Sequence, residues 1–222
     1  MQQQTAVVIG ASGMIGNLVT QFLLADETFS KVRILVRKPI ELLHPKLETT
    51  IVDFNDQNDF KNILGLGDVI FSCIGTTQKN VNGDKALYRK IDFDIPFNAA
   101  AFGKAAGYST FLMVSSVGAN VKSSNFYLRL KGELEQSVMN TGVSAIHIFQ
   151  PSMLLGDRKE NRLGEKFFQH LSKILSNILI GSLRKYRAIE GKTVAKAMVN
   201  AAKENKKGNF FYLFDEMKAL VK

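Results

Sequence analysis

Short apolar runs alternate with helical patterns along most of the chain. The first run, residues 5–10, ends in glycine and is followed by a helical pattern from Met14 to Leu23. Further strands are predicted at residues 32–36, 49–52, 68–74, 110–114 and 144–149, with helices between them at 56–64, 85–106 and 125–140. Strands without polar alternation are typical of a parallel sheet that helices bury on both faces. The order therefore predicts an α/β protein with a doubly wound parallel sheet, the Rossmann fold.

The alternation weakens after Pro151. There we expect helices at 163–183 and 192–204, then a basic loop at 205–209 and a last strand at 210–214. No repeat or linker divides the chain, so residues 1–222 are predicted to form one domain. Residues 151–222 are expected to contribute a small helical cover on its substrate side.

Composition and charge exclude several classes of protein. The 222 residues hold one cysteine, Cys73, which excludes a disulfide framework and favours a reducing, cytoplasmic location. No apolar stretch approaches the roughly 20 residues of a membrane span. The net charge of +9 is uneven: residues 1–156 carry 14 basic and 13 acidic side chains, and residues 157–222 carry 15 and 7. The excess of positive charge therefore belongs to the C-terminal third.

This basic C-terminal third most simply forms a solvated face. Weak peripheral contact with a membrane and binding of a protein partner stay open as alternatives. Nucleic-acid binding is not expected, because basic and aromatic residues do not interleave. The three histidines are far apart in sequence, so no metal site is expected either.

A glycine-rich segment, G-A-S-G-M-I-G, joins the first predicted strand to the first predicted helix. Its spacing suits a dinucleotide cradle: Gly10 for a tight turn, Gly13 for close approach to a pyrophosphate and Gly16 for helix–strand packing. Free N–H groups at a helix start attract phosphate, so the predicted phosphate site also includes three neighbours, Ser12, Met14 and Ile15. The alternative is a plain turn that uses glycine for packing.

The position that usually carries an acidic residue for the ribose 2′-hydroxyl holds Arg37 instead, followed by Lys38. A guanidinium there favours a 2′-phosphate, so we expect NADP(H) to be preferred, with NAD(H) as the alternative. Asp53 ends the third predicted strand ahead of Phe54, and its carboxylate could accept a hydrogen bond from the adenine amino group. Surface cations and a turn aspartate are the simpler interpretations of these residues.

Tyr127 and Lys131 are four residues apart in a predicted helix, which places both on one face. A nearby ammonium lowers the pKa of a phenol and makes it a usable acid or base. Ser115 and Ser116 end the preceding strand, where a hydroxyl could orient a substrate carbonyl. The spacing does not decide between the two serines.

The chain resembles the short-chain dehydrogenase/reductase superfamily, and within it the atypical, Tat-interacting-protein-like oxidoreductases. The resemblance covers nearly the whole chain, through GASGMIG (10–16), SCIGTT (72–77), VSSVGA (114–119), YLRLK (127–131) and QPSMLLGDR (150–158). It implies a general acid/base role for Tyr127, with Lys131 as the partner that also reaches the nicotinamide ribose. It further implies that Gly75 and Thr76 lie beside the cofactor and that Pro151 borders the nicotinamide.

Gln150 departs from this pattern, because the resembling family carries arginine before the proline. The combined prediction is an NADP(H)-dependent oxidoreductase acting on a small carbonyl or alcohol that the sequence does not identify. The alternative is a non-enzymatic NADP(H)-binding redox sensor or regulatory protein, because a fold does not determine a function.

Overall fold

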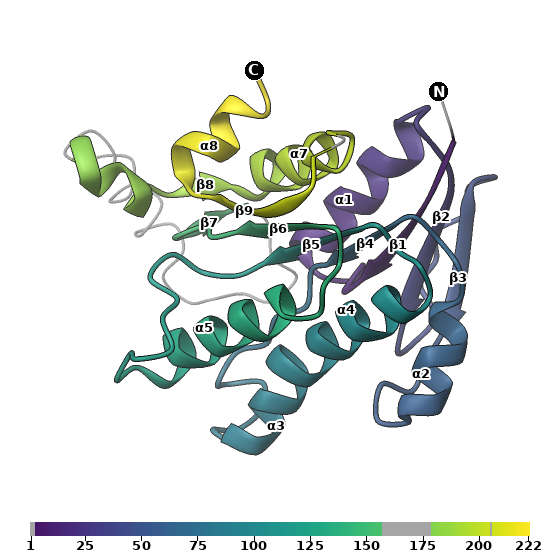
Figure 1. Cartoon of the computed structure of the whole chain (residues 1–222), viewed down its shortest axis with the longest axis horizontal. Coiled ribbons are helices and arrows are strands. Elements are labelled where there is room, and N and C mark those ends of the chain that lie inside the picture. The colour runs from purple at the N-terminus through teal and green to yellow at the C-terminus, as the bar shows by residue number, and fades with distance from the viewer. Residues whose placement is uncertain (1–2, 157–178, 205) are drawn as a thin grey trace.

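The computed structural model describes residues 3–156, 179–204 and 206–222, in which the apolar runs form a seven-stranded parallel sheet (Figure 1). Its strand order is β3-β2-β1-β4-β5-β6-β9. The strands are β1 (Gln4–Ile9), β2 (Phe29–Val36), β3 (Leu47–Ile51), β4 (Val69–Ser72), β5 (Thr110–Val114), β6 (Ala145–Phe149) and β9 (Gly208–Tyr212). The chain moves outward from β1 to β3 and then returns to the other side of β1 at β4. This is the doubly wound Rossmann arrangement that the sequence predicts.

Helices cover both faces of the sheet (Figure 1). One layer contains α1 (Met14–Ala25), α7 (Gly191–Ala202) and the short α8 (Phe214–Ala219). The other contains α2 (Gln57–Leu64), α3 (Lys85–Arg89), α4 (Ile95–Ala105) and α5 (Phe126–Met139). None of the described helices combines the length and the apolar character needed to cross a membrane.

The central strand β1 is buried on both faces, which explains its unbroken apolar sequence. Ala6 and Val8 belong to the core under α1 and α7, whereas Val7 and Ile9 belong to the core under α2, α4 and α5. All four side chains are fully buried. Each buried Val or Ile side chain stabilises the fold by about 1.5–3 kcal/mol.

The expected helix at 85–106 is continuous but contains a π-helical turn, η1 (Lys90–Asp94), between α3 and α4. The N–H of Ile95 donates to the carbonyl of Lys90, one residue further back than in an α-helix. Pro96 follows in the first turn of α4 and has no N–H to continue the ladder. The widened turn therefore ends directly before a proline, and the hydrophobic pattern alone does not indicate it.

The sheet edges and the C-terminal region differ in detail from the expectations. The edge strand β3 is partly exposed, so burial on both faces is wrong for this strand. The last strand is β9 at 208–212 rather than 210–214, because the N–H of Gly208 already donates to Ser144 O at 2.8 Å and continues the ladder on β6. The Glu216 carboxylate then accepts from the N–H of Leu213 at 3.1 Å and starts α8.

The helix expected at 163–183 lies mostly outside the described residues. Its last residues belong to a 3₁₀ turn, η2 (Gly181–Tyr186). A two-stranded parallel sheet joins β7 (Leu154–Leu155) to β8 (Ile189–Glu190) and leads the chain back to α7. From there on, α7 packs beside α1 on one face of the main sheet, and β9 is the edge strand of that sheet next to β6.

Candidate functional site

The glycine segment forms the turn between β1 and α1, at the point where the strand order reverses. Gly10 has φ +86°, and a Cβ there would lie 2.7 Å from the carbonyl oxygen of Cys73, which follows β4. A Cβ on Gly16 would lie 2.1 Å from Gly10 O. Only glycine fits these two positions, because the obstructing atoms are backbone. The tight turn and the close helix–strand packing expected of this segment are both present.

Gly13 is the N-cap of α1 and offers no side chain to the first N–H groups of the helix, and the structure records no side-chain cap there among the described residues. A Cβ on Gly13 would approach Gly10 O at 3.3 Å and no other neighbour so closely. Ser12 is exposed beside it. The helix start is therefore open to an anion, and its N–H groups and dipole favour phosphate.

The side chains of Met14 and Ile15 have neighbours in the C-terminal part of the chain. A Cβ on Gly191 would lie 3.0 Å from Met14 Cε and 3.3 Å from Ile15 Cδ1, so both residues pack against the start of α7. A Cβ on Gly156 would lie 3.1 Å from Met14 Sδ. If Met14 and Ile15 contribute to a phosphate site as predicted, they do so through their backbone N–H groups.

A pocket of about 200 Å³ lies where β2 and β3 end, and three of the sequence candidates, Arg37, Asp53 and Phe54, are among the residues that line it. The exposed Lys38 does not line it. The remaining lining residues, which the sequence reasoning missed, are Asn55, Leu87, Lys90, Ile91 and Ile95. All but Asn55 come from the helix that contains the π-helical turn, and no short motif marks them.

The segment after β4 is tied to the same helix. The N–H of Thr76 donates to Asp92 Oδ2 at 2.8 Å, and the Tyr88 hydroxyl donates to Thr76 O at 3.1 Å. Gly75 is exposed next to them, and a Cβ there would still be 3.9 Å from Asp92. Gly75 and Thr76 therefore form a fixed wall at the carboxyl edge of the sheet.

Tyr127 and Lys131 lie in the first turns of α5, close to this wall. Lys131 Nζ is 6.0 Å from the centroid of the Tyr127 ring and 2.9 Å from Asp92 Oδ1. The side chains of Lys131 and Asp92 are only 3% and 1% exposed. Burial acts to lower the pKa of Lys131, but Asp92, Tyr127 and Glu135 outweigh it and raise that pKa above its ordinary value. Lys131 is therefore a buried ammonium held in its charged form.

Asp92 was not among the sequence candidates. It lies in η1, far from Lys131 in the chain, and no short motif in the sequence distinguishes it from its charged neighbours Lys90 and Asp94. π-helical turns are frequently found at functional sites. Here the turn brings an acidic side chain to the predicted lysine.

The two serines after β5 have different partners. Ser115 is buried, and its hydroxyl donates to Glu135 Oε1. Ser116 is partly exposed, and within the described residues its hydroxyl makes only a long contact of 3.4 Å with Val117 O. Of the two hydroxyls, that of Ser116 therefore has the weaker hydrogen bond within the described residues.

Gln150 completes the buried group around Glu135. Its side-chain amide donates to Glu135 Oε1 at 2.8 Å. Burial raises the pKa of Glu135, although the bonds from Gln150 and Ser115 and the charge of Lys131 oppose this rise. A neutral amide therefore faces a buried carboxyl at the position where the resembling family has arginine.

Pro151 is buried directly after β6, and its carbonyl accepts from the N–H of Val117 at 3.1 Å. This bond joins the proline segment to the serine loop. The continuation of the QPSMLLGDR motif, residues 157–158, lies outside the described residues.

Two residues with reactive side chains belong to the core. Burial raises the pKa of the Cys73 thiol to about 12, which makes it a poor nucleophile. His147 is fully buried, its Nδ1 is 2.8 Å from the Tyr212 hydroxyl, and burial lowers its pKa to about 4. Among the residues that the structure describes, no group of three His, Cys, Asp or Glu side chains could hold a metal.

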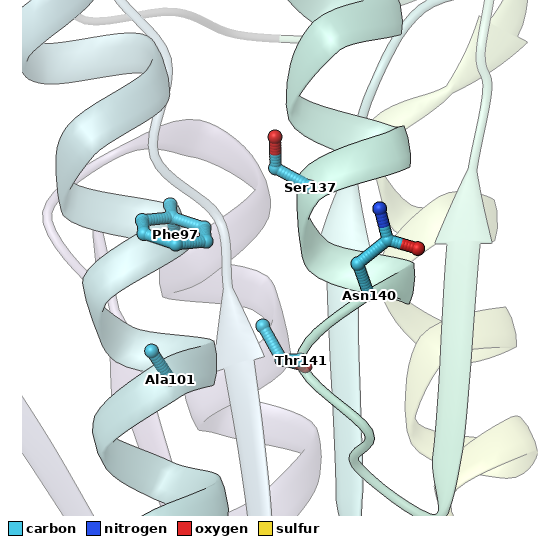
Figure 2. Close-up of a pocket in the computed structure, with 5 residues that line it drawn as sticks. All are labelled: Phe97, Ala101, Ser137, Asn140 and Thr141. Atoms are coloured by element: carbon cyan, nitrogen blue, oxygen red, sulfur yellow. The ribbon is translucent and has the colours of Figure 1, made fainter.

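A second hollow, of about 390 Å³, lies between α4 and the end of α5 (Figure 2). It is lined by Phe97, Ala101, Ser137, Asn140 and Thr141. Tyr127 and Lys131 lie at the other end of α5, and no candidate site residue borders this hollow. It is therefore separate from the carboxyl-edge site.

Comparison with known proteins identifies the family of the chain. The sequence profile of a family described as NAD(P)H-binding matches residues 10–205. Protein HTATIP2 of Rattus norvegicus is 32% identical over 203 residues, covering 90% of this chain and 81% of that protein. Protein FMP52, mitochondrial, of Candida glabrata is 31% identical over 213 residues, covering 94% and 89%.

Solved structures share the fold at low sequence identity. The Bordetella bronchiseptica enzyme WbmH in complex with NAD+ has a TM-score of 0.72 and 16% identity, covering 96% of this chain and 76% of that chain. The UDP-N-acetylglucosamine 4-epimerase from Methanobrevibacter ruminantium M1 has a TM-score of 0.70 and 18% identity, covering 96% and 77%. At this identity the likeness shows the Rossmann fold alone.

Proposed function

The chain belongs to the NAD(P)H-binding family, and on that premise we propose that it is an NADP(H)-dependent oxidoreductase of the atypical short-chain dehydrogenase type. It would transfer a hydride between the nicotinamide and a small carbonyl or alcohol substrate. The observation that carries the proposal is the buried Lys131–Asp92 ion pair beside Tyr127. This pair lies at the same edge of the sheet as the glycine turn.

The residues at this edge suit a dinucleotide. Gly10 and Gly16 let the turn close where a Cβ would collide with backbone, and the start of α1 has no side-chain cap. A pyrophosphate would accept hydrogen bonds from the N–H groups around Gly13. When bound, the dinucleotide supplies or accepts the hydride.

Tyr127 is the proposed general acid in the direction of carbonyl reduction. Its O–H bond breaks, the proton passes to the substrate oxygen, and the electron pair stays on the phenolate oxygen. The charged Lys131 stabilises that phenolate, and Asp92 keeps Lys131 charged and in place. In the reverse direction the phenolate accepts the proton.

Ser116 is the proposed substrate-orienting serine. Its hydroxyl is partly exposed and weakly engaged, whereas the hydroxyl of Ser115 donates to the buried Glu135. We therefore assign Ser115 to support of the α5–β5 contact. Ser116→Ala should reduce turnover strongly, and Ser115→Ala should act mainly on stability.

Titration of the purified chain with NADPH and with NADH, followed by fluorescence, tests the cofactor. We expect tighter binding of NADPH, and Arg37→Ala should weaken NADPH selectively. If neither nucleotide binds, the proposal is contradicted, and the glycines of the turn would then serve packing alone.

Tyr127→Phe separates an enzyme from a non-enzymatic sensor. An enzyme variant should bind NADPH normally and lose turnover in a screen of small carbonyl compounds. If the wild-type chain binds NADPH and reduces none of them, while NADPH alters its binding to a protein partner, the regulatory alternative is favoured.

The cytoplasm is the location that we propose. The names of the FMP52 relatives place those proteins in mitochondria and supply the competing expectation. Fractionation of cells that express the tagged full chain distinguishes the two compartments.

A further inference from the structure

The pocket at the ends of β2 and β3 has one wall that the sequence analysis did not identify. Arg37 follows β2, residues 53–55 follow β3, and the helix that contains η1 supplies the rest of the lining. That helical wall consists of Leu87, Lys90, Ile91 and Ile95. Lys90 is its only charged residue among those that the structure describes.

Two cations in this pocket have no partner within the described part of the chain. Arg37 and Lys90 are exposed and make no ion pair with any described residue. Adjacent cations behave differently: Arg89 pairs with Glu133 at 2.7 Å, and Lys131 pairs with Asp92 at 2.9 Å. The two cations that face the pocket are therefore left available to an anion.

The charge balance shows why a second cation matters. Asp53 also lines the pocket, and its Oδ1 accepts two hydrogen bonds from Asn55, at 2.9 and 2.7 Å. With Arg37 alone, the lining would carry no net charge. Lys90 makes the balance +1, because two cations then face one carboxylate, and a net positive site favours a phosphate.

The helical geometry explains how Lys90 reaches this wall. Leu87, Lys90 and Ile91 follow the i, i+3, i+4 spacing of one helix face. The π-helical turn begins at Lys90, and two residues later Asp92 contacts Lys131 in the interior. One turn of helix thus presents a cation to the pocket and an anion to the catalytic lysine.

We propose that Lys90 is a specificity-determining residue that binds the 2′-phosphate of NADP(H) together with Arg37. Apolar side chains, Phe54, Leu87, Ile91 and Ile95, would enclose the adenine. The inference rests on the proposed function, because it assigns one subsite of the same cofactor.

The test compares ligands that differ only in the 2′-phosphate. Binding of NADPH, NADH, adenosine 2′,5′-bisphosphate and 5′-AMP is measured by titration calorimetry with the full chain. Lys90→Met removes the charge and keeps the length of the side chain. Lys104→Met is the matched control, because Lys104 is exposed in the last turn of α4 and does not line the pocket.

We expect Lys90→Met to weaken NADPH and the bisphosphate about tenfold, as loss of a charge-assisted hydrogen bond does, and to leave NADH and 5′-AMP within about twofold. Lys104→Met should change none of the four. Three results would each overturn the role of Lys90. In the first, Lys90→Met weakens the binding of ligands with and without the 2′-phosphate equally. In the second, Lys104→Met weakens NADPH binding as much as Lys90→Met does, and in the third, Lys90→Met leaves NADPH binding unchanged. Wild-type protein that binds neither NADPH nor NADH would instead overturn the proposed function.

Discussion

The two ends of the candidate site handle charge in opposite ways. At the proposed catalytic end, Lys131 and Asp92 are almost fully buried and paired, and Glu135 is buried beside Ser115 and Gln150. At the proposed nucleotide end, Arg37 and Lys90 are exposed and unpaired within the described residues.

Burial makes electrostatic interactions strong and fixes protonation states, whereas exposure leaves a charge free to exchange water for a ligand. We infer that the catalytic end is coupled to the stability of the fold. The nucleotide end should be alterable without unfolding.

The largest expected effect follows from breaking the buried ion pair. Asp92→Asn keeps the size of the side chain but leaves the Lys131 ammonium without its buried counter-charge. We expect the free energy of unfolding to fall by about 3–5 kcal/mol, measured by urea denaturation. In the double variant with Lys131→Met, the loss should be smaller than the sum of the two single losses. A loss below about 1 kcal/mol for Asp92→Asn would remove the contrast between the two ends.

The glycine turn separates packing from ligand access. Gly16→Ala places a Cβ against Gly10 O and should lower the free energy of unfolding by about 2 kcal/mol, by the cost of overpacking. Gly13→Ala meets only a 3.3 Å contact and should change stability by less than about 1 kcal/mol while weakening nucleotide binding. Equal losses of stability in the two variants, measured by urea denaturation, would contradict this separation.

The pH dependence of stability tests the buried carboxyl. Burial raises the pKa of Glu135, so the folded state favours the protonated acid. Wild type should therefore lose stability relative to Glu135→Gln as the pH rises from the ordinary value of 4.5 through the raised pKa, with each pKa unit worth about 1.4 kcal/mol. Urea unfolding of both proteins between about pH 4 and about pH 8 measures the difference. A difference independent of pH would show that the carboxyl is not perturbed by folding.

The smallest effect is expected for an exposed ion pair on the same helices. Arg89 and Glu133 are 2.7 Å apart, with side chains 46% and 36% exposed. Glu133→Gln should change the free energy of unfolding by about 0.5 kcal/mol or less, and added salt should reduce even that change. A loss comparable to that of Asp92→Asn would mean that burial is not what distinguishes the two pairs.

Local patterns predicted the strands and helices well, because the period of apolar residues reports how each segment is buried. The glycine turn and the Tyr127–Lys131 spacing were also readable, since each depends on neighbours within one turn of structure. The π-helical turn was not, because it changes backbone hydrogen bonds without interrupting the apolar pattern.

Contacts between distant segments escaped the sequence reasoning. Whether Ser115 or Ser116 contacts Glu135 depends on how β5 packs against α5. The sequence of two adjacent serines does not indicate which side chain points toward α5. The contact of Gln150 with Glu135 likewise joins two elements whose approach no local pattern records.

The amino-acid sequence by itself determined the Rossmann architecture, the glycine turn and the pairing of Tyr127 with Lys131 along one helix face. These features follow from backbone sterics and the periodic burial of apolar side chains, which act over a few residues. Only the tertiary structure decided that Asp92 holds Lys131 and that Lys90 and Arg37 line the same pocket. Those relations depend on the relative placement of helices and strands, because electrostatic and hydrogen-bond partners are chosen by distance in space.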